Sequence, residues 1–235
     1  MAIIEQSLKP GARLPEDAIG ETFGTSRTIA REALGRLAVE GLVELKQNRG
    51  AFVASPSLEE GRAVFVVRNG LERTVVQHLA GHLTEHDQER LRSHVESEQQ
   101  ASGRDEARSV RLAGEFHLAL ASMTGNQLLE RYVTEVVSRC SLILARYGRP
   151  HSSECAITEH AEIVDALAAG DAATACELME QHLDAVANRA LPRVRANAEL
   201  RDVLLPYAVA AGQVRSGVAE VVATRTKKRV RKTAK

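Results

Sequence analysis

Two arginines four residues apart, Arg27 and Arg31, have the chemistry needed to bind nucleic acid. On a helix, residues at this spacing project from one face, so both guanidinium groups would meet the same ligand. Arginine bonds guanine edges in the major groove and also binds phosphates. The hydroxyls of Ser26 and Thr28 lie beside them, where a helix N-terminus presents free N–H groups to phosphate.

The surrounding residues predict the helix that holds these arginines and a second helix before it. Gly24 is typical of the end of the first helix, Ser26 suits the N-cap of the second, and Gly41 stops the second. The apolar spacing predicts a face that docks on a small core, formed by Ile29, Ala33, Leu34 and Leu37.

A short β-hairpin is expected after the basic helix. Residues 42–45 and 51–53 flank a turn at residues 47–50, which places Arg49 and Gly50 at the tip. Helix, turn, basic helix and basic hairpin are the layout of a winged helix-turn-helix, which we predict for residues 1–56. Without the hairpin, the two arginines would be interpreted more simply as a solvated helix face.

Beyond a break at residues 55–57, the pattern changes to long helical periods without strand alternation. The fold is therefore predicted to be mainly α, with an all-α helical bundle over residues 62–200. Its helices are expected around residues 71–83, 112–123 and 128–144, before Gly170, and at 172–191.

Composition limits the class of protein. A chain of 235 residues with 44% hydrophobic and 3% aromatic residues suits one small and one medium domain with an aliphatic interior. The three cysteines, Cys140, Cys155 and Cys176, lack CxxC spacing, so a reducing, cytoplasmic location is expected. The sequence shows no signal peptide and no apolar run of about 18 residues, so no membrane partner is expected.

The charge of the chain is unevenly distributed. The 31 basic and 31 acidic residues give a net charge of zero, yet residues 224–235 hold seven Lys or Arg and no acid. We predict a basic, disordered tail over residues 212–235, able to hold DNA phosphates without sequence preference. Residues 1–56 balance seven basic residues against seven acidic ones, so DNA affinity there must come from where the arginines sit.

The N-terminal residues resemble the GntR family of bacterial transcription regulators. The similarity covers residues 8–54, with Ile29-Ala30 in place of the usual pair and with few residues left for a first helix. The residues that carry it are Leu14-Pro15-Glu16, Phe23-Gly24-Thr25-Ser26-Arg27-Thr28, Arg31-Glu32-Ala33-Leu34, Leu37, Glu40-Gly41-Leu42-Val43 and Arg49-Gly50-Ala51-Phe52-Val53.

The second part, over roughly residues 62–195, resembles the ligand-binding domain of the FCD subgroup of that family. The matching stretches are Arg68-Asn69-Gly70-Leu71-Glu72, Phe116-His117, Thr124-Gly125-Asn126-Gln127-Leu128-Leu129, Glu159-His160, Ala169-Gly170-Asp171 and Met179-Glu180-Gln181-His182-Leu183.

The resemblance implies a metal site at His117, His160 and His182, each on a separate predicted helix. Three imidazoles suit Zn, Ni or a similar divalent ion with a position open to a ligand oxygen. The subgroup's aspartate ligand is replaced by Ala113, which cannot coordinate. Two outcomes stay open: a three-histidine metal site, or an effector pocket without metal.

The resemblance also implies a small carboxylate effector in the bundle. Arg68 matches an arginine that often faces the pocket and could pair with a carboxylate. Asn126 and Arg139 are further candidate contacts, although Asn126 also suits a helix cap. A second group of histidines, at 78, 82 and 86, has helical spacing but no partner to complete a metal site.

We therefore expect a DNA-binding transcription regulator, a repressor rather than an enzyme, that acts as a homodimer on a palindromic operator in double-stranded DNA. Three alternatives remain from the sequence. The metal itself could be the signal, the three histidines could serve a metal-dependent enzyme, or the basic tail could serve an architectural DNA protein.

Overall fold

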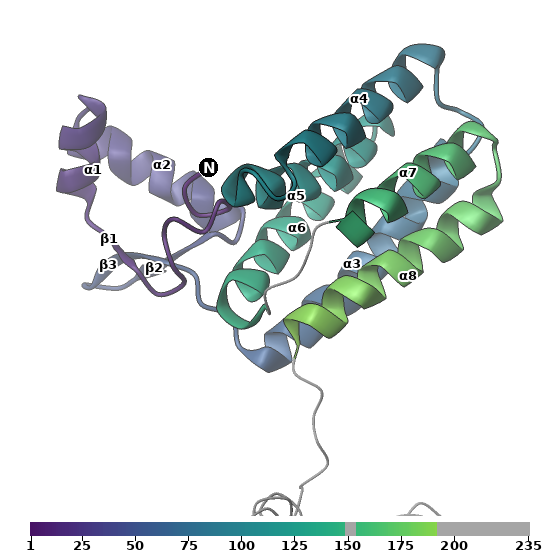
Figure 1. Ribbon diagram of the computed structural model, residues 1–235. Helices are drawn as coiled ribbons and strands as arrows, with labels where there is room; N and C mark the ends of the chain where they lie inside the picture. The colour runs from purple at the N-terminus through teal and green to yellow at the C-terminus, as the bar shows by residue number, and fades with distance from the viewer. Residues whose placement is uncertain (149–153, 192–235) are drawn as a thin grey trace, which may run out of the picture. The chain divides into compact units, whose positions relative to one another are not determined.

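The computed structural model describes residues 1–148 and 154–191, and the predicted tail at 212–235 lies outside them. Figure 1 shows a small mixed N-terminal part and a set of long helices, as the sequence predicted. The N-terminal elements are β1 (Arg13–Leu14), α1 (Glu16–Phe23), α2 (Arg27–Val39), β2 (Val43–Lys46) and β3 (Gly50–Val53).

The expected turns and caps of the N-terminal part are present. Gly24 ends α1 in the left-handed region with a φ of 62°, and the side chain of Ser26 accepts the N–H of Ile29 at 3.3 Å to cap α2. Asn48 and Gly50 at the hairpin tip also have positive φ, which suits asparagine and glycine in a tight turn.

The hairpin strands β2 and β3 belong to a three-stranded antiparallel sheet in the order β1-β3-β2, in which β3 is the central strand. Val43 pairs with Val53 and Lys46 with Gly50, while Arg13 of β1 pairs with Phe52. The strand β1 was not expected from the sequence, because two residues are too short to show alternation.

The buried face of α2 differs from the expected one. Leu34 is buried as predicted and Leu37 is half-buried, but Ala30 is buried where Ile29 was expected. Ile29 is 56% exposed and Ala33 is also exposed. The prediction for Ile29 and Ala33 was wrong because the face of α2 that packs on α1 and β2 lies about one residue position further round the helix axis.

The helices α3 to α8 form the bundle, and each of the following packs on the next: α3, α6, α5, α4, α7 and α8, with α8 closing the ring on α3. Their bounds are α3 Leu58–Leu79, α4 Glu85–Ala101, α5 Glu106–Met123, α6 Gln127–Tyr147, α7 Glu154–Ala168 and α8 Ala172–Ala190. Among the described residues, no helix is long and apolar enough to cross a membrane.

Side-chain caps fix where these helices begin. Ser57, Asp105 and Asp171 each accept a backbone N–H in the first turn of α3, α5 and α8. Thr84 and Asp87 form a reciprocal capping box at the start of α4. Each such cap contributes about 1 kcal/mol and sets the register in which the helix presents its side chains.

The helix α4 was missed by the sequence analysis. Its surface is almost entirely polar, and its buried side chains are only Leu91, Glu98 and Ala101. A buried carboxylate on the inner face breaks the apolar period that predicts a helix. Glu98 is buried because it has a partner within the bundle, described below.

The bundle core is aliphatic, as expected, and it includes Leu91, Leu120, Ile163, Leu167 and Met179 with nearly no exposure. Leu91 is fully buried and belongs to the one helix that brings few apolar side chains to this core. The attachment of α4 therefore depends strongly on this residue.

We expect Leu91→Ala to lower the free energy of unfolding by about 2–5 kcal/mol, since it removes buried methyl groups and leaves a cavity. The measurement is chemical denaturation followed by circular dichroism. Ser93→Ala, at an exposed position of the same helix, is the control and should change stability by less than about 0.5 kcal/mol. Equal effects of the two variants would contradict this account of how α4 is held.

Candidate nucleic-acid interface and candidate metal centre

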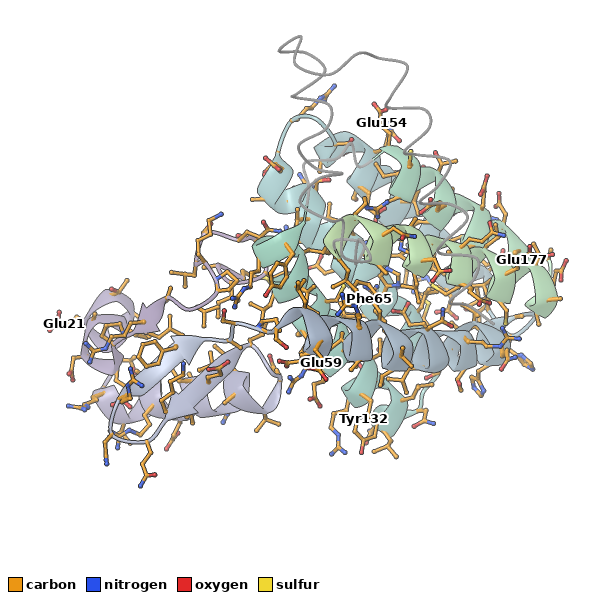
Figure 2. All side chains as sticks on the ribbon, turned by 90° about the horizontal axis from the view of Figure 1, so that it is seen from below. Glu21, Glu59, Phe65, Tyr132, Glu154 and Glu177 are labelled. Atoms are coloured by element: carbon orange, nitrogen blue, oxygen red, sulfur yellow. The ribbon has the colours of Figure 1, made fainter. Side chains whose placement is uncertain are left out.

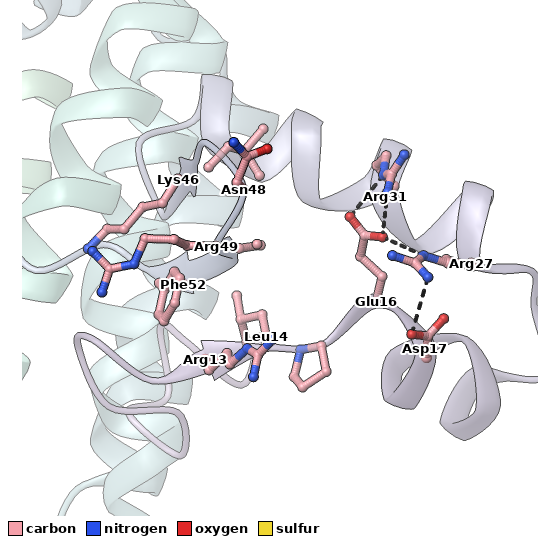
Figure 3. Close-up of a pocket in the computed structure, with 14 residues that line it drawn as sticks. Arg13, Leu14, Glu16, Asp17, Arg27, Arg31, Lys46, Asn48, Arg49 and Phe52 are labelled. Carbon is pink, nitrogen blue, oxygen red and sulfur yellow. Dashed lines mark hydrogen bonds and ion pairs between the residues drawn. The ribbon is translucent and has the colours of Figure 1, made fainter.

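A groove of about 820 Å³ lies between α1, α2 and the hairpin (Figure 3). Arg27, Arg31, Arg49 and Gly50, which the sequence analysis selected, all line it. Ser26 and Thr28 are exposed at the N-terminus of α2 and do not line it. The structure thus brings the basic residues of the helix and of the hairpin to one surface.

Two further basic residues line this groove and were missed: Arg13 and Lys46. Lys46 bonds Glu44 at 3.1 Å and lies 5.0 Å from the centre of the Phe52 ring. Arg13 reaches the groove because β1 pairs with β3, and Lys46 reaches it because β2 pairs with β3. The sequence offered only a weak signal for them: Arg13 directly precedes Leu14, and Lys46 directly precedes the turn at residues 47–50.

An acidic residue of α1 contacts both arginines of α2. Glu16 accepts the Nε–H of Arg27 at 2.8 Å, and the Nε–H and an Nη–H of Arg31 at 2.9 Å each. Hydrogen bonds from Arg31 and then Arg27 lower the pKa of the Glu16 carboxyl to about 2, so it stays charged at neutral pH.

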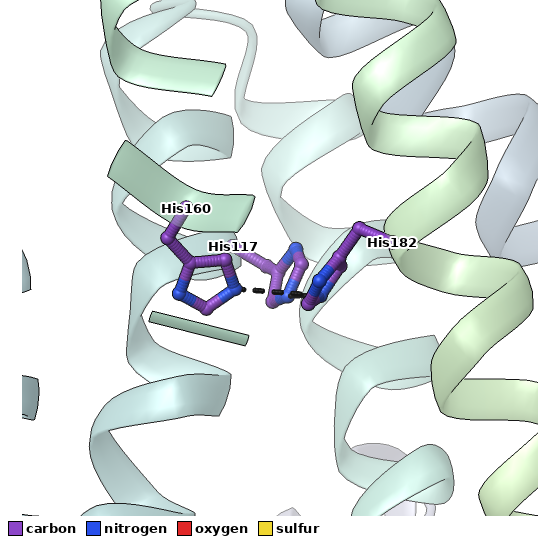
Figure 4. Close-up of side chains that lie close together, drawn as sticks. All are labelled: His117, His160 and His182. Atoms are coloured by element: carbon purple, nitrogen blue, oxygen red, sulfur yellow. Dashed lines mark hydrogen bonds between the residues drawn. The ribbon is translucent and has the colours of Figure 1, made fainter. Parts of the chain in front are cut away.

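The second candidate site lies inside the bundle. His117 of α5, His160 of α7 and His182 of α8 are all buried, and one nitrogen of each lies within 4.8 Å of the others (Figure 4). The Nε2 atom of His182 is 3.3 Å from Nε2 of His160 and 3.3 Å from Nε2 of His117. The sequence prediction that these three residues come together is confirmed.

A glutamate contacts the other ring nitrogen of each histidine. The Nδ1 atom of His160 lies 2.9 Å from a carboxylate oxygen of Glu98, and Nδ1 of His182 lies 2.6 Å from Glu159. Nδ1 of His117 makes a short contact with Glu72. Because a carboxylate accepts a hydrogen bond from Nδ1–H, each Nε2 is left with its lone pair toward the centre.

The protonation states favour metal binding. Burial lowers the pKa of His117 to about 4 and that of His182 well below its usual value, so both rings are neutral at pH 7. Burial raises the pKa of Glu72, but attraction to Arg68 and His117 outweighs it and the pKa is lowered to about 2. Burial likewise raises the pKa of Glu98, but hydrogen bonds from His160 and His94 outweigh this effect and lower the pKa to about 2.

The donor set fits a divalent ion such as zinc. A tetrahedral ion with bonds of about 2.0–2.1 Å to nitrogen separates its ligand atoms by about 3.3–3.4 Å. The two Nε2 separations of 3.3 Å match this value. Carboxylates on Nδ1 are the usual outer partners of metal-binding histidines, and here they supply negative charge that Ala113 does not.

A cavity of about 90 Å³ adjoins the histidines. Ala113 lines it together with His117 and His182, so the position that would carry the subgroup's aspartate instead leaves space. Arg68 and Arg189 also line the cavity. Arg189 is half-buried, and this burial lowers the pKa of its guanidinium.

Arg68 was expected to pair with the carboxylate of an effector, but in the structure it already pairs with a carboxylate of the bundle. Its Nε–H donates to Glu72 at 2.5 Å, and one Nη–H donates to the Sγ atom of Cys140 at 3.0 Å. Glu72 in turn contacts His117. Arg68 therefore balances the charge of the carboxylate that orients a histidine, while it also lines the cavity.

The structure does not bring the other two predicted effector residues to this cavity. Asn126 accepts the N–H groups of Leu128 and Leu129 at 3.1 Å each, and so caps α6. Arg139 binds Glu60 and Glu135 at the surface. The cation that sequence analysis missed is Arg189, although its spacing of seven from His182 places both on one helix face.

The histidines at 78, 82 and 86 do not share a helix. The helix α3 ends at Leu79 and α4 begins at Glu85, so His82 lies in the connection between them. The rings of His78 and His82 stack with centres 6.2 Å apart. The expectation from their spacing that these three histidines share one helix was wrong, because α3 ends about one turn earlier than the apolar pattern indicated.

A winged helix-turn-helix joined to a helical bundle with an internal ligand site defines a class of DNA-binding regulators. The profile of the FCD domain matches residues 63–185, and that of the bacterial regulatory proteins of the gntR family matches residues 1–53. The chain therefore belongs to the GntR family of transcriptional regulators and carries an FCD effector-binding domain.

Individual relatives agree with this assignment. The chain is 31% identical over 206 residues to the HTH-type transcriptional regulator LutR of Bacillus subtilis, covering 75% of this chain and 90% of that protein. It is 24% identical over 186 residues to the HTH-type transcriptional repressor RspR of Escherichia coli, covering 78% and 82%. A solved GntR regulator from Rhodococcus sp. RHA1 superposes with a TM-score of 0.68 at 26% identity, covering 79% and 90%.

We expect Glu98→Gln to weaken zinc binding by roughly 10- to 100-fold, because it removes the charged acceptor that orients His160. Affinity is measured by competition with a chromogenic chelator. Glu96→Gln, an exposed residue of the same helix, is the matched control with the same loss of charge. Identical affinities in the two variants would show that Glu98 does not act on the metal site.

Proposed function

We propose that this regulator is a repressor that binds a palindromic operator as a homodimer and responds to a small carboxylate effector in the bundle. The observation that carries the proposal is the convergence of the Nε2 atoms of three buried histidines beside a cavity lined by Arg189. Such a site can bind an anion while the winged helix-turn-helix contacts DNA. A cytoplasmic location follows from this role.

DNA recognition is assigned to the residues of the groove and of the N-terminus of α2. Arg27 and Arg31 would read base edges in the major groove, and Ser26 and Thr28 would bind phosphate at the helix N-terminus. Arg49 and Gly50 at the hairpin tip would contact an adjacent stretch of the duplex. The concentration of basic residues around one concave surface supports this assignment.

The effector site is assigned to the cavity beside the histidines. His117, His160 and His182 would hold a Zn or Ni ion, which would supply a Lewis-acidic position for an effector oxygen. Arg189 would pair with the effector carboxylate, since it is half-buried and lines the cavity. The small volume favours an acid of only a few heavy atoms.

Homodimer formation is supported by exposed apolar side chains on two helices that pack together, α3 and α6. Val66 and Val67 of α3 are 75% and 51% exposed, and Leu128 and Tyr132 of α6 are 56% and 43% exposed. Tyr132 projects away from the ribbon (Figure 2). A dimer would cover such residues and would also present two winged helix-turn-helix units to two half-sites.

The repressor role is supported by the name of one relative, RspR, which is described as a repressor. Effector binding would change operator affinity only if the effector prefers one arrangement of the two DNA-binding units. The cavity is lined by residues of α3, α5, α6, α7 and α8, so a bound anion would contact several helices at once and would favour the arrangement that places their contacts correctly.

We expect Arg31→Ala to weaken operator binding by about 1–3 kcal/mol, as for the loss of one bidentate base contact. Affinity is measured by fluorescence anisotropy on a duplex selected from a random pool by the native protein. Arg36→Ala is the control, because Arg36 is an exposed arginine of the same helix that does not line the groove. Unchanged operator affinity in Arg31→Ala would remove this residue from the recognition set.

The metal assignment has a direct test in the metal content of the purified full-length protein, measured by mass spectrometry. We expect bound Zn or Ni that is lost in His117→Ala and retained in His78→Ala, an exposed histidine outside the cluster. Absence of metal even after incubation with excess zinc would contradict the metal site. The histidines and Arg189 would then be candidates for direct effector contact.

A further inference from the structure

The contact between Glu16 and the two arginines of α2 links the two helices of the DNA-binding unit. Glu16 is the first residue of α1, and Arg27 and Arg31 lie in the first two turns of α2. The side chain of Glu16 is only 16% exposed, whereas the side chains of Arg27 and Arg31 are 60% and 64% exposed. One shielded carboxylate is thus shared by two exposed cations.

The hydrogen bonds engage one particular edge of each guanidinium. Both Nε–H groups point to Glu16, and Arg31 also gives it one Nη–H (Figure 3). A guanidinium carries five N–H donors, so most donors of both arginines stay available for a further acceptor. The two bonds to Glu16 fix the plane of the Arg31 guanidinium, whereas Arg27 is held by its one bond to Glu16 and by an ion pair of an Nη atom with Asp17 at 3.5 Å.

This arrangement has two consequences for DNA binding. An exposed arginine samples many rotamers, and holding it in one orientation before binding reduces the ordering cost of a base contact. The carboxylate also offsets part of the positive charge, which weakens attraction to phosphates in any sequence. Both effects favour recognition of particular bases over general adhesion to the duplex.

We propose that Glu16 is a positioning residue that orients Arg27 and Arg31 for base recognition and limits their contact with phosphates. The proposal rests on the proposed role of these arginines in operator recognition. A carboxylate in this groove would by its charge repel DNA phosphates, and the positioning role explains why it is there.

The test compares Glu16→Gln with Glu21→Gln in the full-length protein. Glu21 is an exposed acid on the same helix, so its replacement removes the same charge close to DNA without touching the arginines. Binding is measured on a duplex selected from a random pool and on a scrambled duplex of equal length and composition. Both are titrated over a range of salt concentrations.

For Glu16→Gln we expect the ratio of operator affinity to scrambled-duplex affinity to fall about tenfold or more, as for an impaired bidentate base contact. On the scrambled duplex the salt slope should steepen by about 0.9 for each additional phosphate contact. Glu21→Gln should leave the ratio within about twofold of the native value, since a charge that does not contact the arginines acts on both duplexes alike.

A purely structural role would give a different result. If Glu16 only joins α1 to α2, Glu16→Gln lowers the thermal midpoint and weakens binding to both duplexes equally, which overturns the proposal. Glu16→Asp keeps the charge but shortens the side chain, so it separates the effect of charge from that of geometry. If both Glu16→Asp and Glu16→Gln keep the native ratio of operator affinity to scrambled-duplex affinity, the proposal is also overturned.

Failure of the proposed function is distinguishable from failure of this inference. If Arg31→Ala does not weaken operator binding, the recognition role of the arginine is wrong and Glu16 has nothing to position. If Arg31→Ala weakens operator binding while Glu16→Gln behaves like Glu21→Gln, recognition stands and only the positioning role is rejected.

Discussion

Buried carboxylates that contact histidines are the constraint on which the bundle depends. Glu72 and Glu98 are almost fully buried, and removing an unpaired carboxylate from water is costly. Each is therefore held by partners on other turns or helices: Glu72 by Arg68 and His117, and Glu98 by His160. These contacts fix the orientation of the imidazoles, and they explain why a polar helix such as α4 belongs to the ring.

The candidate metal centre follows from this constraint. A histidine whose Nδ1 donates to a carboxylate presents the lone pair of Nε2, and three such histidines converge between α5, α7 and α8. Replacement of the usual aspartate by Ala113 leaves a cavity rather than a collapsed gap, with Arg189 on its lining. The same position that lacks a ligand atom thus contributes space for an external anion.

The DNA-binding unit also contains a paired carboxylate, but its partners are arginines rather than histidines. There a carboxylate, Glu16, accepts hydrogen bonds from guanidinium groups instead of imidazoles and fixes their orientation at an exposed surface. In both places an acid is paired so fully that it keeps its charge at neutral pH. The pairing determines which donor or lone pair remains free for an external ligand.

The sequence by itself determined the features that depend on local spacing. The helix-turn-helix with its hairpin, the helical bundle and the cap at Asn126 were predictable, because caps, glycine turns and apolar periods act over a few residues. The three histidines followed from the resemblance to the FCD subgroup, and the structure brings them together. Only the tertiary structure decided which residues meet across long separations. Glu98 and His160 are 62 residues apart, and Glu16 and Arg31 are 15 apart. The exposure of Ile29, the pairing of Arg68 and the place of Arg189 in the cavity likewise depend on packing between elements, which no local pattern records.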